Sequence, residues 1–135
     1  MSLRRIFAGG TAAILGLALA ASTVFAAVGN QNPNLTVQLT LNPTVVTAPG
    51  KATAYAAITN NTSKTNNVAA EIEVTAPSGA TVSYYKTLAI KAGKTVSYSV
   101  TYRVPYFAEK GVYTVILSGT DTAGTSSATE YLTVQ

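Results

Sequence analysis

Apolar and polar residues alternate with a period of two over most of this chain, which is the pattern of half-buried β-strands. Residues 35–41 read Leu-Thr-Val-Gln-Leu-Thr-Leu, and residues 96–104 place Val or Tyr at every second position between Ser, Thr and Arg. Successive side chains of a strand point to opposite faces, so each segment has one apolar face to bury. We expect strands over residues 35–41, 52–59, 68–74, 81–90, 96–104, 113–118 and 128–134.

Turn-forming residues separate these segments. Pro49-Gly50, Pro77-Ser78-Gly79 and Ala92-Gly93 each interrupt the alternation, and a stretch containing Gly and Asp does so at 120–125. No segment beyond the first 26 residues has helical periodicity, so a parallel sheet would lack its crossover helices. Short strands with turns roughly every 8–12 residues predict an all-β fold, a sandwich of about seven antiparallel strands.

The first 26 residues have the composition of an export signal. Arg4 and Arg5 precede an uncharged stretch rich in Ala, Leu and Gly, and Val24-Phe25-Ala26 provides a cleavage site. This order predicts a signal peptide over 1–26, a flexible lead over 27–34 and a single domain over 35–135. We expect an exported protein, periplasmic or extracellular, that meets a membrane only if the signal stays uncleaved. The Arg4-Arg5 pair leaves both Sec and twin-arginine export open.

The segment Glu109-Lys110-Gly111-Val112-Tyr113-Thr114-Val115 resembles the start of strand F in immunoglobulin-like and fibronectin type III-like sandwiches. A Tyr at that place bonds through its hydroxyl to the backbone a few residues upstream, forming a tyrosine corner. The segment Leu88-Ala89-Ile90-Lys91-Ala92-Gly93-Lys94-Thr95 resembles the step into strand E of bacterial CARDB-type modules. The resemblance covers residues 35–134. It implies an immunoglobulin-like β-sandwich in which Tyr113 is the structural tyrosine corner.

The composition argues against catalysis. The chain has no Cys and no His, so disulfides, a thiol nucleophile and the commonest general base are excluded. Glu71 and Glu73 are a closely spaced carboxylate pair, but the alternation places both on the outward face of a strand. Asp121 is a single carboxylate in a turn, which is too few ligands for calcium. We expect no enzyme, no cofactor and no metal site.

Charge gives no indication of a nucleic-acid partner. The net charge of +4 includes Arg4 and Arg5 of the predicted signal, and the remaining lysines are spread along the sequence. Nucleic-acid binding requires clustered basic residues. We therefore expect a protein partner or self-association, with polysaccharide as a further possibility.

Four aromatic residues are candidate contacts for a ligand or partner. Tyr84 and Tyr85 are adjacent in a predicted strand, so one of them must face outward. Tyr106 and Phe107 lie in a predicted loop after Pro105. Exposed aromatic side chains stack on sugars or anchor protein partners.

Three functions fit these features. The leading one is an exported, non-enzymatic immunoglobulin-like module with a structural or protein-interaction role at the cell surface or in the periplasm. An alternative is a self-assembling surface-layer or filament subunit that pairs through exposed strand edges. Another is a carbohydrate-binding protein that uses exposed tyrosines.

Overall fold

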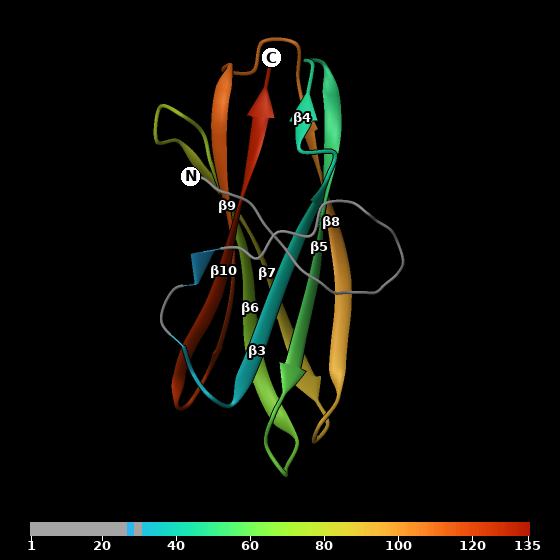
Figure 1. Cartoon of the computed structure of the whole chain (residues 1–135), viewed down its shortest axis with the longest axis vertical. Helices are drawn as coiled ribbons and strands as arrows, with labels where there is room; N and C mark the ends of the chain where they lie inside the picture. Colours follow the sequence, from blue (N-terminus) through green and yellow to red (C-terminus); the bar gives the residue numbers. More distant parts are fainter. Residues whose placement is uncertain (1–26, 29–30) are drawn as a thin grey trace.

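Two β-sheets packed face to face form the domain (Figure 1). The structure, a computed structural model, describes residues 27–28 and 31–135. Within these residues there is no helix long and apolar enough to cross a membrane. The signal peptide predicted over 1–26 lies outside the described residues. The expected all-β sandwich is confirmed.

The two sheets divide the strands unequally. The larger sheet has the order β2-β10-β9-β6-β7, with β4 also paired to β10. Its strands are β2 (Ala27–Val28), β4 (Val45–Val46), β6 (Asn66–Thr75), β7 (Thr81–Ile90), β9 (Gly111–Asp121) and β10 (Gly124–Val134). The smaller sheet has the order β3-β5-β8. Its strands are β3 (Leu35–Asn42), β5 (Gly50–Asn60) and β8 (Thr95–Val104).

Each segment predicted from the alternation forms one of the seven long strands of the described chain. The two-residue strands β2 and β4 were not expected, because two residues are too few to show a period. β4 runs parallel to β10, with Val45 opposite Thr133. The seven long strands pair antiparallel throughout, as expected, and β4 adds one short parallel pairing.

The core lies between the inner faces of the two sheets. Leu39, Ile58, Ile72, Leu117 and Leu132 are at most 1% exposed, as the alternation requires. The inner face of β5 differs because three of its residues are small. Ala52, Ala54 and Ala56 are buried there, and a small hollow between the sheets lies beside Ala52 and Ala54.

One side of the sandwich is closed by the chain that follows β3. β3 pairs with β5 in the smaller sheet, and β4 then joins the larger sheet beside β10. The Thr133 backbone N–H donates to the Thr44 carbonyl at 2.8 Å. The Ser126 hydroxyl donates to the Leu35 carbonyl at 3.3 Å. These contacts join β3 and its continuation to β10.

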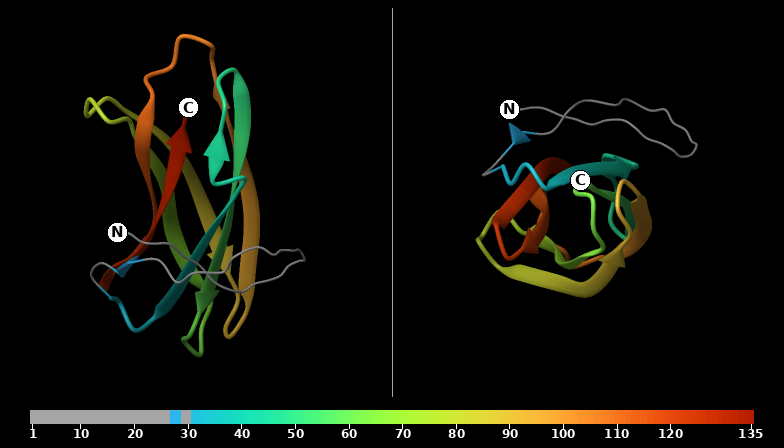
Figure 2. Two further views of the ribbon diagram at one scale, coloured as in Figure 1. Left: turned by 45° about the horizontal axis from the view of Figure 1, so that its top comes forward. Right: turned by 90° about the horizontal axis from the view of Figure 1, so that it is seen from below.

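The other side of the sandwich is open. β7 and β8 are the last strands of their respective sheets, and no ladder joins them in the described sheets (Figure 2). The inner-face residues Val96, Tyr98, Val100 and Tyr102 of β8 are consequently only partly buried.

Candidate functional site

Two exposed aromatic side chains lie at the end of the sandwich where β8 crosses to β9. Tyr106 is 78% exposed and Phe107 is 76% exposed. Their rings pack edge to face, with centroids 5.4 Å apart and planes at 87°, which is a favoured aromatic geometry. The loop therefore presents both rings to solvent as a pair.

The base of this loop is held by hydrogen bonds. The Ala108 N–H donates to the Pro105 carbonyl at 3.0 Å. The Tyr113 hydroxyl donates to the Glu109 carbonyl at 2.7 Å, which is the contact that defines a tyrosine corner. The Tyr113 ring also packs against Tyr102 at 6.2 Å between centroids. Burial, with smaller contributions from Tyr102 and Glu109, raises the pKa of Tyr113, so this hydroxyl stays a donor at neutral pH.

Other exposed apolar residues lie around the same end of the sandwich, which we call the apolar end. Among the described residues seven large apolar side chains are well exposed. Five of them are at this end, in β4, at the starts of β7 and β9, and in the β8–β9 loop: Val45, Val82, Tyr106, Phe107 and Val112. The alternation could not show this grouping, because these residues are far apart in the chain.

The structure separates the four candidate aromatic residues. Tyr106 and Phe107 form one pair. Tyr85 is 78% exposed on the outer face of the larger sheet, where it lies opposite Glu71 in the ladder. Tyr84 is half-buried and faces the opposite sheet. The four side chains therefore do not form a single site.

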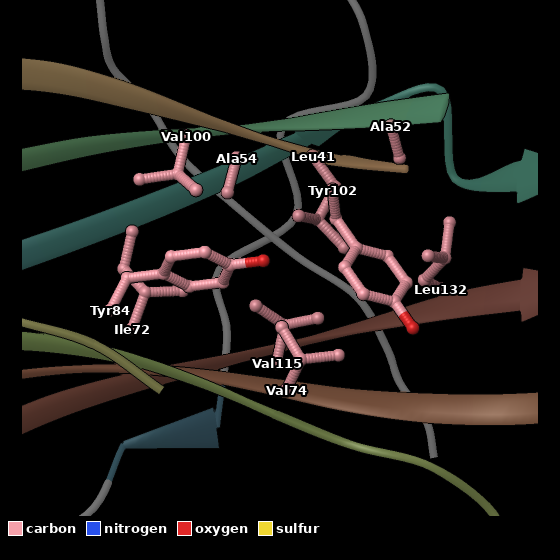
Figure 3. Close-up of a pocket in the computed structure, with 10 residues that line it drawn as sticks. All are labelled: Leu41, Ala52, Ala54, Ile72, Val74, Tyr84, Val100, Tyr102, Val115 and Leu132. Carbon is pink, nitrogen blue, oxygen red and sulfur yellow. The ribbon is translucent and has the colours of Figure 1, made fainter. Parts of the chain in front are cut away.

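Tyr84 instead lines a hollow between the sheets. It lies across from Ala54 and Val100, with Tyr102 on the far side of the hollow (Figure 3). The remaining lining residues are apolar: Leu41, Ala52, Ile72, Val74, Val115 and Leu132. Burial, and secondarily Tyr84, raises the pKa of Tyr102. The hollow is a gap in packing beside the small residues of β5.

A lysine lies across the open side near this hollow. The Lys86 ammonium of β7 is 5.2 Å from the centroid of the Tyr98 ring of β8, within the range of a cation–π contact. Burial raises the pKa of Tyr98. The Tyr98 hydroxyl is buried and finds no hydrogen-bond partner among the described residues. Lys86 thus contributes a charge to the inner face of an edge strand.

The carboxylate pair Glu71 and Glu73 lies on the outer face of β6. Each is partly exposed, and the neighbouring ladder positions are Ser118 and Tyr85 beside Glu71. Ser83 and Ile116 flank Glu73. This face is a continuous sheet surface, and the pair does not line the hollow.

Asp121 is enclosed by asparagines. Its carboxylate accepts from the side chains of Asn32 (2.6 Å), Asn34 (3.2 Å) and Asn66 (2.8 Å) and from the Ala123 N–H (2.7 Å). Burial raises the pKa of Asp121, but these hydrogen bonds outweigh burial and lower it to about 2. Residues 27–28 and 31–135 hold no group of three or more acidic, His or Cys residues suited to a metal ion.

The sequence-based expectations missed four buried polar residues, one of which is Ser126, 0% exposed on the inner face of β10. Asn32, inside the predicted flexible lead, is 4% exposed, and Asn60 is 0% exposed. Glu130 is 3% exposed on the inner face of β10. The period of two gave a signal for Glu130, because it is two residues from the inward Leu132. No local pattern marks the two asparagines.

Searches with protein-family models and against curated protein sequences find no match for this chain. Its fold is similar to part of the alkylpurine DNA glycosylase AlkC of Pseudomonas fluorescens bound to DNA (TM-score 0.66, 10% identity, 76% of this chain and 30% of that chain). It is also similar to part of a β-glucosidase from Listeria innocua (TM-score 0.59, 11% identity, 74% and 16%). The chain thus spans less than a third of either protein.

A CARDB domain from Pyrococcus furiosus, solved in complex with di-metal ions, matches over more of its own length. The TM-score is 0.53 at 12% identity, and the match covers 82% of this chain and 90% of that domain. At such low identity these likenesses show the fold alone, a CARDB-like β-sandwich.

Proposed function

We propose that this protein is an exported, non-enzymatic module that binds a protein partner through its apolar end. The observation that carries the proposal is the pair Tyr106 and Phe107. Both rings are more than three-quarters exposed, yet the loop beneath them is fixed by the Tyr113–Glu109 hydrogen bond. Aromatic side chains are the residues most enriched where binding energy concentrates.

The fixed conformation of the loop favours a binding role for its two exposed rings. A loop already held in one conformation loses less conformational entropy when a partner covers it. Val112 and Val45, exposed by 54% and 49% at the same end, extend the apolar surface around the pair. Exposed apolar groupings on small soluble domains mark interaction sites.

Three features support the non-enzymatic and exported parts of the proposal. The chain has no His and no Cys. Asp121 is occupied by hydrogen bonds within the domain, and Glu71 and Glu73 do not line the hollow. The signal peptide predicted over 1–26 supports export.

The test is site-specific photocrosslinking in the native host. A photoreactive phenylalanine analogue replaces Tyr106 in one variant and Tyr85 in the control. The two positions are equally exposed, at 78%, and differ only in the surface they report. We expect a discrete protein adduct from position 106 in the envelope or extracellular fraction, and its loss when Phe107→Ser is added.

Equal adducts from both positions, or none from position 106, contradict a specific apolar-end contact. A retarded band in polysaccharide-containing native gels, removed by Tyr106→Ser and Phe107→Ser but not by Tyr85→Ser, supports the carbohydrate alternative in place of a protein partner. Recovery of the protein only from the cytoplasm with residues 1–26 intact contradicts export.

A further inference from the structure

The open side of the sandwich leaves two long strand edges without a neighbour. β7 and β8, each ten residues long, end the larger and the smaller sheet. An unpaired edge presents free N–H and C=O groups to any other strand. On the closed side, β2 and β4 each pair with two residues of β10, and β3, the other end of the smaller sheet, packs beside β10 instead of facing solvent along an open side.

β7 and β8 differ in how open their edges are to another strand. β7 carries Lys86 near its middle, on the inner face and over the Tyr98 ring. An inward charge on an edge strand is a recognised device against pairing. β8 has no charge from Thr95 to Tyr102, no Pro and no Gly, and its first charge is Arg103. The β8 edge is therefore better suited than the β7 edge to pair with another strand.

β8 is also complementary to itself. Its outer face presents Thr and Ser until Arg103, and its inner face alternates Val and Tyr. In an antiparallel pair, residues directly opposite each other share a face. With a two-fold axis at Ser99, Ser97 lies opposite the partner's Thr101, and Tyr98 lies opposite the partner's Val100.

The pairs formed this way are favourable ones. Aromatic and β-branched residues opposite each other stabilise a sheet, and so do hydroxyl pairs. Within the monomer the same sheet already contains hydroxyl pairs, such as Thr53 with Thr101 at 3.1 Å. Arg103 falls opposite the partner's Thr95, so no like charges meet. A two-fold axis at Val100 instead of Ser99 also places inner-face residues opposite inner-face residues and outer-face residues opposite outer-face residues.

We propose that two copies of this chain associate by antiparallel pairing of β8 with β8 about a two-fold axis. The pairing joins two three-stranded sheets into one six-stranded sheet and covers the half-buried Val96, Tyr98 and Val100. Because Lys86 disfavours the β7 edge, the assembly closes at two copies, unlike an open filament. A single strand pair is a small interface, so we expect a dissociation constant on the order of 10–100 μM.

The first test is sedimentation equilibrium of the purified domain over about 1–500 μM, a range that spans the expected constant. The edge variant combines Ser97→Lys and Thr101→Lys, which places ammonium groups opposite each other or opposite Arg103. The matched control combines Ala57→Lys and Thr53→Lys. These residues are the ladder neighbours of Ser97 and Thr101 on the central strand of the same sheet face.

We expect a reversible wild-type dimer that the edge variant weakens at least tenfold and the control leaves within about threefold. Salt should not weaken the dimer, because no opposite charges meet at the β8 edge. A wild-type protein that is monomeric throughout overturns the proposal. Equal weakening by both variants indicates packing through the sheet face and also overturns it. Circular dichroism and thermal melts of each variant establish that it folds.

Cysteine scanning locates the axis, because the chain contains no Cys of its own. Under mild oxidation we expect rapid disulfide-linked dimer from Ser99→Cys or from Val100→Cys, and slow reaction from Ala57→Cys. If Ala57→Cys forms the disulfide-linked dimer as fast as Ser99→Cys or Val100→Cys does, pairing through the β8 edge is overturned. The β8 edge and the apolar end are separate surfaces, so the crosslinking result at position 106 stands whichever way this test falls.

Discussion

At the scale of single residues, buried polar side chains organise the end of the sandwich opposite the apolar end. The side-chain amide of the fully buried Asn60 donates to the backbone carbonyls of Lys64 (2.7 Å) and Ile90 (2.8 Å), and its side-chain oxygen accepts from the Thr62 N–H (2.9 Å). It thereby joins the β5–β6 and β7–β8 loops. Such fully satisfied polar groups specify one arrangement of loops. Asp121 acts similarly on the segment before β3 and on Asn66.

Asp121 should make stability depend on pH in the acid range. Its pKa falls from 3.8 to about 2 in the folded protein, so its stabilisation is complete above about pH 4 and is lost as the pH falls toward 2. After allowance for its partial solvent exposure we expect a loss of about 1 kcal/mol. The measurement is urea denaturation of the wild type and Asp121→Asn at pH 5, 4, 3 and 2.

The comparison with Asp121→Asn separates the contribution of Asp121 from every other effect of acid on the protein. The stability difference between the two proteins should shrink as the pH falls. A difference that stays constant from pH 5 to pH 2 contradicts a stabilising role for the ionised carboxylate.

At the scale of elements, the alternation located every long strand, because burial of one sheet face is a local pattern. It also placed Tyr84 and Tyr85 on opposite faces, which the structure bears out. Strand edges, however, depend on which strand follows in the sheet. The sequence of β7 is nearly as suited to pairing as that of β8, and Lys86 makes the difference.

Removing that charge should open the β7 edge. Lys86→Leu leaves β7 with uninterrupted alternation and no inward charge, so we expect association beyond the dimer at concentrations where the wild type stops. The change in folding stability should stay below about 1 kcal/mol, the usual size of a partly exposed cation–π contact. Light scattering after size-exclusion chromatography measures the assembly.

Lys51→Leu is the matched control, since it removes the same charge from the outer face of β5, the central strand of the smaller sheet, where Lys51 lies opposite Arg103 of β8. Larger assemblies from Lys51→Leu as well would attribute the effect to net charge or surface hydrophobicity. No larger assembly from Lys86→Leu would show that Lys86 does not protect the edge.

At the scale of the whole molecule, the two sides of the sandwich differ in how the sheets are joined. The side joined by β3, β4 and β10 is closed, whereas the side between β7 and β8 is open. The hollow lies between the two sheets beside Ala52 and Ala54 of β5, and residues of both sheets line it. Ala54 lines this hollow, whereas Ala56, the next inward residue of β5 and also buried, does not. The packing defect is thus confined to one part of the core.

Filling the hollow should stabilise the domain. Ala54→Val adds two carbons where space exists, and we expect a gain of about 0.5–1 kcal/mol in the free energy of unfolding. Ala56→Val adds the same volume where the core is filled and should cost about 1 kcal/mol. Urea denaturation measures both changes in the free energy of unfolding from the shift in the midpoint, provided that the m-value stays the same. Destabilisation by Ala54→Val as large as that by Ala56→Val would show that the hollow cannot accept a side chain.

The sequence alone determined where the strands lie, which of their residues face inward, and that an all-β sandwich follows. It also indicated Tyr113 and the exposed loop with Tyr106 and Phe107. All of these follow from local features, a period of two and turn residues, because a strand's faces are set by its own backbone.

Only the tertiary structure decided which distant residues meet. It brought Asn32, Asn34 and Asn66 to Asp121, grouped the apolar residues at one end, parted Tyr84 from Tyr106, and left β8 with a free edge. These outcomes depend on strand order and on crossings between sheets. Such long-range pairings are chosen by the packing of the whole core, and no short stretch of sequence contains them.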